Sequence, residues 1–182
     1  YTLFSDMIEE KFGINVWADL IDKTNPDTGG IYTAVDVYPD EELLAYVAEL
    51  SQSTGIAVPE LVKAFGSYLI GRFFEIHPEF FQNHNAKSFL KSVHDVIHVE
   101  VKKLHPDAIL PEFTYQDPDD HSLTMVYTSP RKLCKLAEGL IEGAGKHFNT
   151  EIILEHPICM NDGADNCHLN LKFGAVDASE AA

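Results

Sequence analysis

The hydrophobic periodicity of the chain changes once, after Pro106. Before it, apolar residues recur at helical spacing, which predicts helices over about 2–13, 15–24, 39–55, 59–73 and 86–104. After it, apolar and polar residues alternate over 113–115, 123–127, 151–155 and 167–173, which predicts strands, with a turn at 117–120 and one further helix over 130–148. Helices first and then a small antiparallel sheet with a helix packed on it make an α+β fold.

The 182 residues are expected to form a single domain, with subdomains at about 1–83 and 84–174 and an aperiodic tail at 175–182. The net charge of −16 disfavours nucleic acid and anionic membranes as partners. No apolar run reaches the roughly 18 residues of a membrane helix. Three cysteines, an odd number, do not suggest a disulfide framework, so a cytoplasmic location is expected.

The last helix before Pro106 carries a histidine on its apolar face. His98 lies between Ile97 and Val101, which belong to a stripe of branched aliphatic side chains. An imidazole in this setting either hydrogen-bonds to a backbone carbonyl or ligates a metal or haem iron. His94, one turn earlier on the same face, is a rival, and the H-x-x-x-H pair could also bind zinc with a further ligand.

A polar run follows the predicted strand at 123–127. Tyr127, Ser129 and Arg131 supply two hydroxyls and one guanidinium within five residues. Arg binds carboxylates through two parallel hydrogen bonds, and hydroxyls add further bonds. Because haem carries two propionate carboxylates, this run and the helical histidine together suit a haem site.

The chain resembles the haem-nitric oxide/oxygen binding (H-NOX) domains, the family of the haem domain of soluble guanylate cyclase. The resemblance rests on the D-V-I-H run ending at His98, on Pro111 thirteen residues later and on the Y-x-S-x-R run at 127–131. It covers nearly the whole chain and is strongest to stand-alone bacterial sensors. It implies haem b between a distal helical and a proximal α/β subdomain, with His98 on the iron, Pro111 distorting the porphyrin and the 127–131 run on the propionates.

The resemblance also predicts which gas is bound. Aligning the 127–131 run and two glycines with the family places Phe4, Leu69 and Leu136 on the distal side, where O2-binding relatives have a tyrosine. Bound O2 requires a hydrogen-bond donor, whereas NO and CO need one much less. The expectation is therefore a ferrous haem that binds NO and CO but forms little stable O2 complex.

The mechanism implied by the family is sensing. NO weakens or breaks the bond between His98 and the iron, the strain held by Pro111 relaxes, and a surface of the domain changes. The sequence lacks the G-x-S-x-G, H-E-x-x-H and glycine-rich phosphate motifs of enzymes, so no catalysis is expected. Since 182 residues leave no room for an output domain, the expected partner is a histidine kinase or a diguanylate cyclase acting in trans.

A second metal site is predicted in the last third of the chain. Its four ligands form a Cys3His set, which suits tetrahedral zinc: Cys134, His156, Cys159 and Cys167. Some bacterial family members carry a similar set. His168 is an alternative fourth ligand, although strand alternation turns it away from Cys167. The other interpretation is three unrelated buried thiols.

If zinc is bound, its thiolates are also open to oxidation, which would make the site sensitive to redox conditions. The alternative function is therefore a zinc-binding, redox-responsive interaction domain without a gas-sensing role. The colour of the purified protein separates the two functions, because haem absorbs visible light and zinc does not.

Overall fold

The structure is a computed structural model that describes residues 1–33 and 36–175. The longer helices are α1 (Thr2–Phe12), α2 (Ile14–Thr24), α3 (Asp40–Thr54), α4 (Val58–Ile76), α5 (Ala86–Ser92), α6 (His98–Leu104) and α7 (Cys134–His147). Three short helices are η1 (Pro78–Phe80), η2 (Val93–Ile97) and η3 (Met160–Asp162). The strands are β1 (Glu112–Asp119), β2 (Ser122–Thr128), β3 (Thr150–Ile158) and β4 (Cys167–Ala175). The predicted α+β fold is confirmed, and residues 176–182 of the predicted tail lie outside the described residues.

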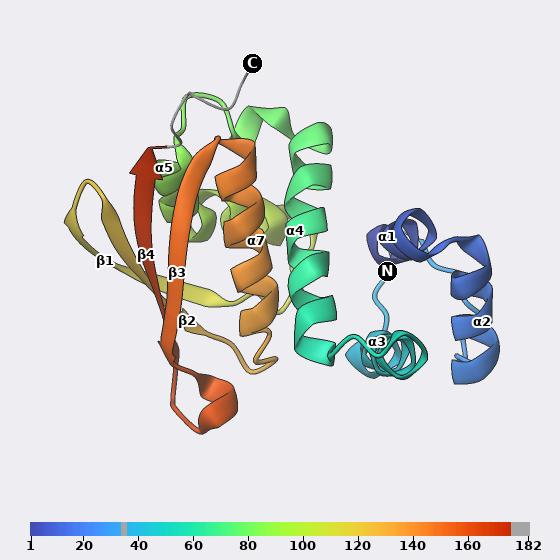
Figure 1. Cartoon of the computed structure of the whole chain (residues 1–182). Helices are drawn as coiled ribbons and strands as arrows, with labels where there is room; N and C mark the ends of the chain where they lie inside the picture. Colours follow the sequence, from blue (N-terminus) through green and yellow to red (C-terminus); the bar gives the residue numbers. More distant parts are fainter. Residues whose placement is uncertain (34–35, 176–182) are drawn as a thin grey trace, which may run out of the picture.

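The strands form one antiparallel sheet in the order β1-β2-β4-β3. Figure 1 shows α4 and α7 side by side between this sheet and the three N-terminal helices. One face of the sheet is buried: Leu123 and Met125 of β2 and Leu169 and Leu171 of β4 share a hydrophobic cluster with α5 and α7. The period of two along these strands arises because alternate side chains point into this cluster.

A second hydrophobic cluster joins α1, α2 and α3 to the first part of α4. Phe4, Ile8, Leu20 and Leu50 are buried in it, as is Leu61 of α4. Further along α4, Ile70 belongs instead to the cluster under the sheet. The core residues therefore divide along α4, whereas the predicted subdomain boundary near residue 83 lies after it.

Glycines allow α4 and α7 to approach closely. A Cβ atom added to Gly139 would lie 1.9 Å from the carbonyl oxygen of Lys63, and one added to Gly66 would lie 2.3 Å from that of Leu136. Both distances are far below van der Waals contact. The helices thus pack backbone against backbone, which fixes the position of α7 against α4.

The single helix predicted over 86–104 is wrong in detail. Between α5 and α6 lies the π-helical turn η2, in which the N–H of His98 donates to the carbonyl of Val93, five residues earlier. A π turn takes in one more residue than an α turn. Val93, Ile97 and Val101 keep the four-residue spacing of an α-helix through this turn, so the sequence did not reveal it.

Two predicted boundaries are also corrected. β1 continues through the expected turn to Asp119, with a bulge before it; Pro118 is tolerated because β1 is an edge strand. The helix expected from residue 130 begins at Cys134, since Lys132 has a φ of 50° and the N–H of Leu133 donates to the Tyr127 hydroxyl. A left-handed residue and a side-chain acceptor both delay the first helical turn.

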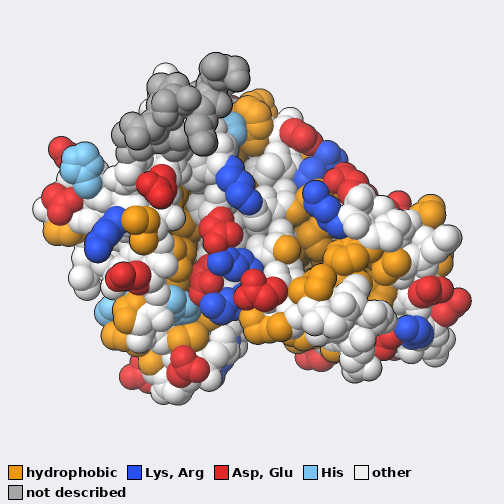
Figure 2. Space-filling model, in the orientation of Figure 1, with side chains coloured by type: hydrophobic (Ala, Val, Ile, Leu, Met, Phe, Trp, Pro, Cys, Tyr) orange, Lys and Arg blue, Asp and Glu red, His pale blue; other side chains and the backbone are white. Residues whose placement is uncertain are grey.

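Charge is spread over the surface. Figure 2 shows Asp and Glu side chains over both the sheet-bearing half and the helical half of the visible face, in keeping with the net charge of −16. In the described part of the chain, none of the helices has the length and apolar character needed to cross a membrane.

Candidate functional site

A cavity of about 400 Å³ lies among α1, α4, the α5–α6 segment, strands β1 and β2, and α7. This is within the range of small-molecule and cofactor sites. Its lining is largely apolar, and every main element of the fold except α2, α3, β3 and β4 contributes to it. The arrangement suits a large hydrophobic ligand.

His98 lines this cavity, as predicted for the axial residue. Its Nδ1 atom is buried and has no hydrogen-bond partner. Burial lowers the pKa of His98, and the neighbouring His94 lowers it further. The backbone of Pro111 partly opposes this shift. A neutral imidazole is the form that ligates metals.

The rival histidine is placed differently. His94 does not line the cavity, and its Nδ1 accepts a long, 3.4 Å hydrogen bond from the backbone N–H of Phe113. Pro111 does line the cavity, next to Leu110 and Ile109. The structure therefore brings together the predicted axial histidine and the predicted distorting proline, and leaves the rival histidine outside.

The predicted carboxylate-binding residues form a polar edge of the same cavity. Tyr127, Ser129 and Arg131 all line it, and the first two are buried. Burial raises the pKa of Tyr127, so its hydroxyl stays protonated. The Ser129 hydroxyl accepts the backbone N–H of Arg131 at 3.2 Å, and the Arg131 guanidinium pairs with Asp40 at the start of α3. The residues present thus fit haem: one imidazole, two apolar walls and a cationic, hydroxyl-bearing edge.

The predicted distal residues are only partly at the wall. Leu69 and Leu136 line the cavity, but Phe4 does not; its neighbour Leu3 does. Phe4 is 1% exposed and packs in the N-terminal cluster, with ring centroids 5.3 Å from Phe65. Successive residues of a helix point about 100° apart, and here Leu3 points to the cavity while Phe4 points into the N-terminal cluster.

Sequence reasoning missed several other wall residues. Ile70 and Phe73 of α4 and Leu140 of α7 complete the apolar surface beside Leu69 and Leu136. Their helical spacing predicted a buried face. The spacing did not show whether these side chains pack against other parts of the protein or line a cavity.

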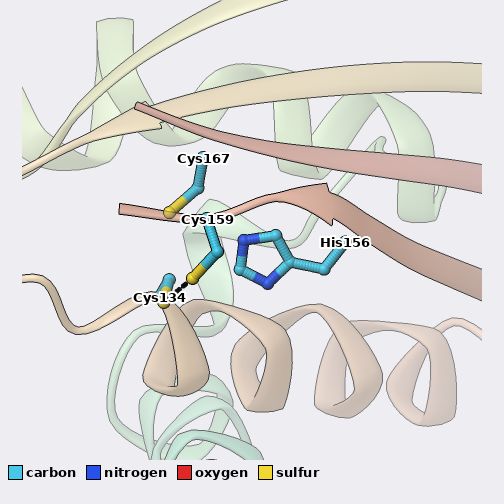
Figure 3. Close-up of side chains that lie close together, drawn as sticks. All are labelled: Cys134, His156, Cys159 and Cys167. Carbon is cyan, nitrogen blue, oxygen red and sulfur yellow. Dashed lines mark hydrogen bonds between the residues drawn. The ribbon is translucent and has the colours of Figure 1, made fainter. Parts of the chain in front are cut away.

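The four predicted zinc ligands come together in the structure. Figure 3 shows Cys134 at the first turn of α7, facing His156, Cys159 and Cys167 from the region of β3 and β4. One ligand atom from each lies within 4.8 Å of all the others. The Cys134 and Cys159 sulfurs are 3.7 Å apart. Two thiolates on one tetrahedral zinc lie about 3.8 Å apart, given Zn–S bonds of about 2.3 Å.

The histidine of the cluster is oriented by a carboxylate. His156 Nδ1 lies 2.7 Å from Glu138 Oε1, while its Nε2 is buried and has no hydrogen-bond partner. Glu138 is only 3% exposed and also pairs with Lys135. Metal-ligating histidines commonly have such a carboxylate on the other ring nitrogen. Burial raises the pKa of Cys134 to about 12, so metal binding there would release a proton.

Comparison with known proteins identifies the family. A search of curated proteins returned no match. The family described as Haem-NO-binding matches residues 1–156. An H-NOX protein from S. oneidensis, solved in the Fe(II)NO state, is 33% identical with a TM-score of 0.88 and covers 95% of this chain and 96% of its own. An unliganded Fe(II) H-NOX protein from K. algicida is 29% identical, with a TM-score of 0.84 and coverage of 96% and 95%.

A third structure, an IWP-051-bound H-NOX from Shewanella woodyi in the Fe(II)CO state, is 31% identical with a TM-score of 0.83 and covers 100% of this chain and 96% of its own. The similarity extends over both the helical half and the sheet, and the cavity with His98 lies between them. The chain therefore belongs to the H-NOX family of haem-based gas sensors.

Proposed function

We propose that this protein binds haem b in the cavity beside His98 and senses NO, with CO as a second ligand. The observation that carries the proposal is the lining of the cavity, in which the imidazole of His98, whose buried Nδ1 has no hydrogen-bond partner, meets apolar walls and a single polar edge. Relatives solved with NO and CO on ferrous haem support it.

Each residue has a role in this proposal. Haem, when bound, would supply a ferrous iron that takes a gas. His98 would ligate the iron, Tyr127, Ser129 and Arg131 would bind the carboxylates, and Pro111 would press on the ring. The wall made by Leu3, Leu69, Ile70, Phe73, Leu136 and Leu140 has no hydrogen-bond donor in its side chains, which disfavours O2 relative to NO and CO.

The output requires a change of shape. NO shifts a conformational equilibrium only if it binds one conformation better than the other. The pair between Arg131 and Asp40 links the polar edge of the cavity to α3, so a displacement at this edge has a direct route to the helical half. We propose a histidine kinase or a diguanylate cyclase as the partner, and NO-loaded protein added in trans should change its rate of autophosphorylation or of cyclic dinucleotide synthesis.

The test of gas binding is absorption spectroscopy of haem-loaded, reduced protein. The Soret band should shift on addition of NO and on addition of CO, and should stay that of the unliganded ferrous protein during brief exposure to air. A stable shift in air would contradict the proposed ligand preference. Protein that stays colourless after reconstitution with haem would overturn the function itself.

We further propose that Cys134, His156, Cys159 and Cys167 bind one zinc ion. The support is the mutual distance of the four ligand atoms and the Glu138 carboxylate behind His156. The family match does not favour a zinc-only interaction domain, so this site is proposed in addition to haem. Metal analysis of reduced protein should find one zinc per chain, and its absence after incubation with zinc would exclude the site.

A further inference from the structure

One short segment contacts both proposed sites. Residues 129–133 connect β2 to α7. Ser129, Arg131 and Leu133 line the haem cavity, and the next residue, Cys134, belongs to the Cys/His cluster. Lys132 has a φ of 50°, so the segment has a defined, left-handed bend.

On the cavity side, the segment is held by Tyr127. The Tyr127 hydroxyl accepts the backbone N–H of Leu133 at 3.0 Å, while its ring lines the cavity. Across the sheet, Tyr127 is paired directly with Cys167, a member of the cluster. Both side chains are almost fully buried, at 2% and 0% exposed. The cluster therefore contacts a haem-binding residue through a cross-strand pair.

On the cluster side, the segment is held by Asn161. Its Nδ2 donates to the carbonyl of Lys132 at 3.2 Å and lies 3.2 Å from the sulfur of Cys134. Close by, the backbone N–H of Met160 donates to the sulfur of Cys167, also at 3.2 Å. The turn at 160–162 thus binds the two cluster sulfurs and the middle of the 129–133 segment at once.

We infer that a metal ion on the Cys/His cluster fixes the 129–133 segment in the shape that grips the haem carboxylates, so that metal binding and haem binding are positively coupled. This inference rests on both sites of the proposed function. Without the ion, the four ligand side chains have no common partner, and the sulfurs of Cys134 and Cys167 accept only weak hydrogen bonds from Asn161 and from the backbone of Met160. With the ion, the segment is ordered before haem arrives, so less conformational entropy is lost when haem binds.

Coupling of this kind is reciprocal: haem must raise the affinity for zinc by the same factor by which zinc raises the affinity for haem. The experiment is a cycle of equilibrium measurements on reduced, full-length protein. Zinc affinity is obtained by dialysis against a chelator of known strength, with and without haem, and haem affinity by partition against apomyoglobin, with and without zinc. Both ratios should be equal, at roughly tenfold.

Two variants locate the coupling. Asn161→Ala keeps all four ligands, so it should still bind zinc, but both ratios should fall towards one. Asp162→Asn alters an exposed side chain of the same turn and should leave both ratios at their original value. A comparable loss in both variants would overturn the role of Asn161.

The outcomes separate this inference from the proposals beneath it. Protein that binds one haem and one zinc with ratios of one overturns the coupling alone. Protein that binds haem but takes up no zinc overturns the coupling and the zinc site but leaves the gas sensor intact. Protein that takes up no haem overturns the sensor and the coupling together.

Discussion

The haem cavity and the Cys/His cluster share α7 but are built in opposite ways. α7 contributes Leu136, Ala137 and Leu140 to the cavity, and its first residue, Cys134, to the cluster. The cavity is wide and apolar and takes side chains from most of the fold, whereas the cluster is four ligand atoms within 4.8 Å. A large hydrophobic cofactor needs area, and a metal ion needs a few donor atoms at short distance.

This difference indicates which single substitutions should weaken binding at each site. The proposed haem binding would spread over many contacts, so most single changes in the wall should be tolerated, and the imidazole is the exception. The proposed zinc binding would depend on each ligand and on what orients it. Single substitutions in each site and in the helix that they share test this contrast.

The largest effect is expected for His98→Gly. It should remove protein ligation of the iron entirely, while the apolar walls still retain haem when free imidazole is supplied. The measurement is the absorption spectrum of the reduced protein with and without imidazole. His94→Gly is the matched control and should leave the spectrum unchanged, since His94 lies outside the cavity. The reverse pattern would mean that His94, and not His98, ligates the iron.

A second variant, Glu138→Gln, tests the cluster. Loss of an orienting carboxylate typically lowers metal affinity about 10–100-fold, so zinc affinity should fall by this range. Glu142→Gln, on the same helix but paired with Lys63, is the control and should bind zinc normally. Chelator competition measures both. Equal zinc affinity in Glu138→Gln and the original protein would mean that the carboxylate does not support His156.

Gly139→Ala tests the contact that positions α7 for both sites. The added methyl group would collide with the Lys63 carbonyl, so a loss of about 1–3 kcal/mol in the free energy of unfolding is expected. On α4, Gly71 has nothing within 4 Å of an added Cβ. Gly71→Ala should therefore stabilise the protein by up to about 1 kcal/mol through helix propensity. Urea unfolding distinguishes the two, and effects of the same sign would argue against the close packing.

The smallest effect is expected for Arg131→Gln at the polar edge of the cavity. The Arg131 side chain is 34% exposed, and an ion pair of this exposure contributes up to about 1 kcal/mol. Haem affinity should therefore fall by no more than about fivefold, as measured by partition against apomyoglobin. Arg72→Gln, which breaks a pair with Glu75 away from the cavity, should have no effect on haem. A complete loss of haem in Arg131→Gln would show that this one contact dominates retention.

Much of the fold follows from local patterns. Periods of 3.6 and 2 correctly separate the helical half from the sheet, because one face of each element is buried in a cluster. The boundaries that failed depend on single interactions, namely the N–H of Leu133 on Tyr127 and the π turn before His98. Neither interaction could be predicted from the spacing of the hydrophobic residues.

The residue types available for each site can be read from the sequence: two histidines on one apolar helical face, a Y-x-S-x-R run, and three cysteines with His156. Three further facts are visible in the folded chain alone: Leu3 rather than Phe4 faces the cavity, the Glu138 carboxylate contacts His156, and residues 129–133 join the two sites. These facts depend on contacts between distant segments. The composition and spacing of a chain specify which face of an element is apolar, but not what that face meets.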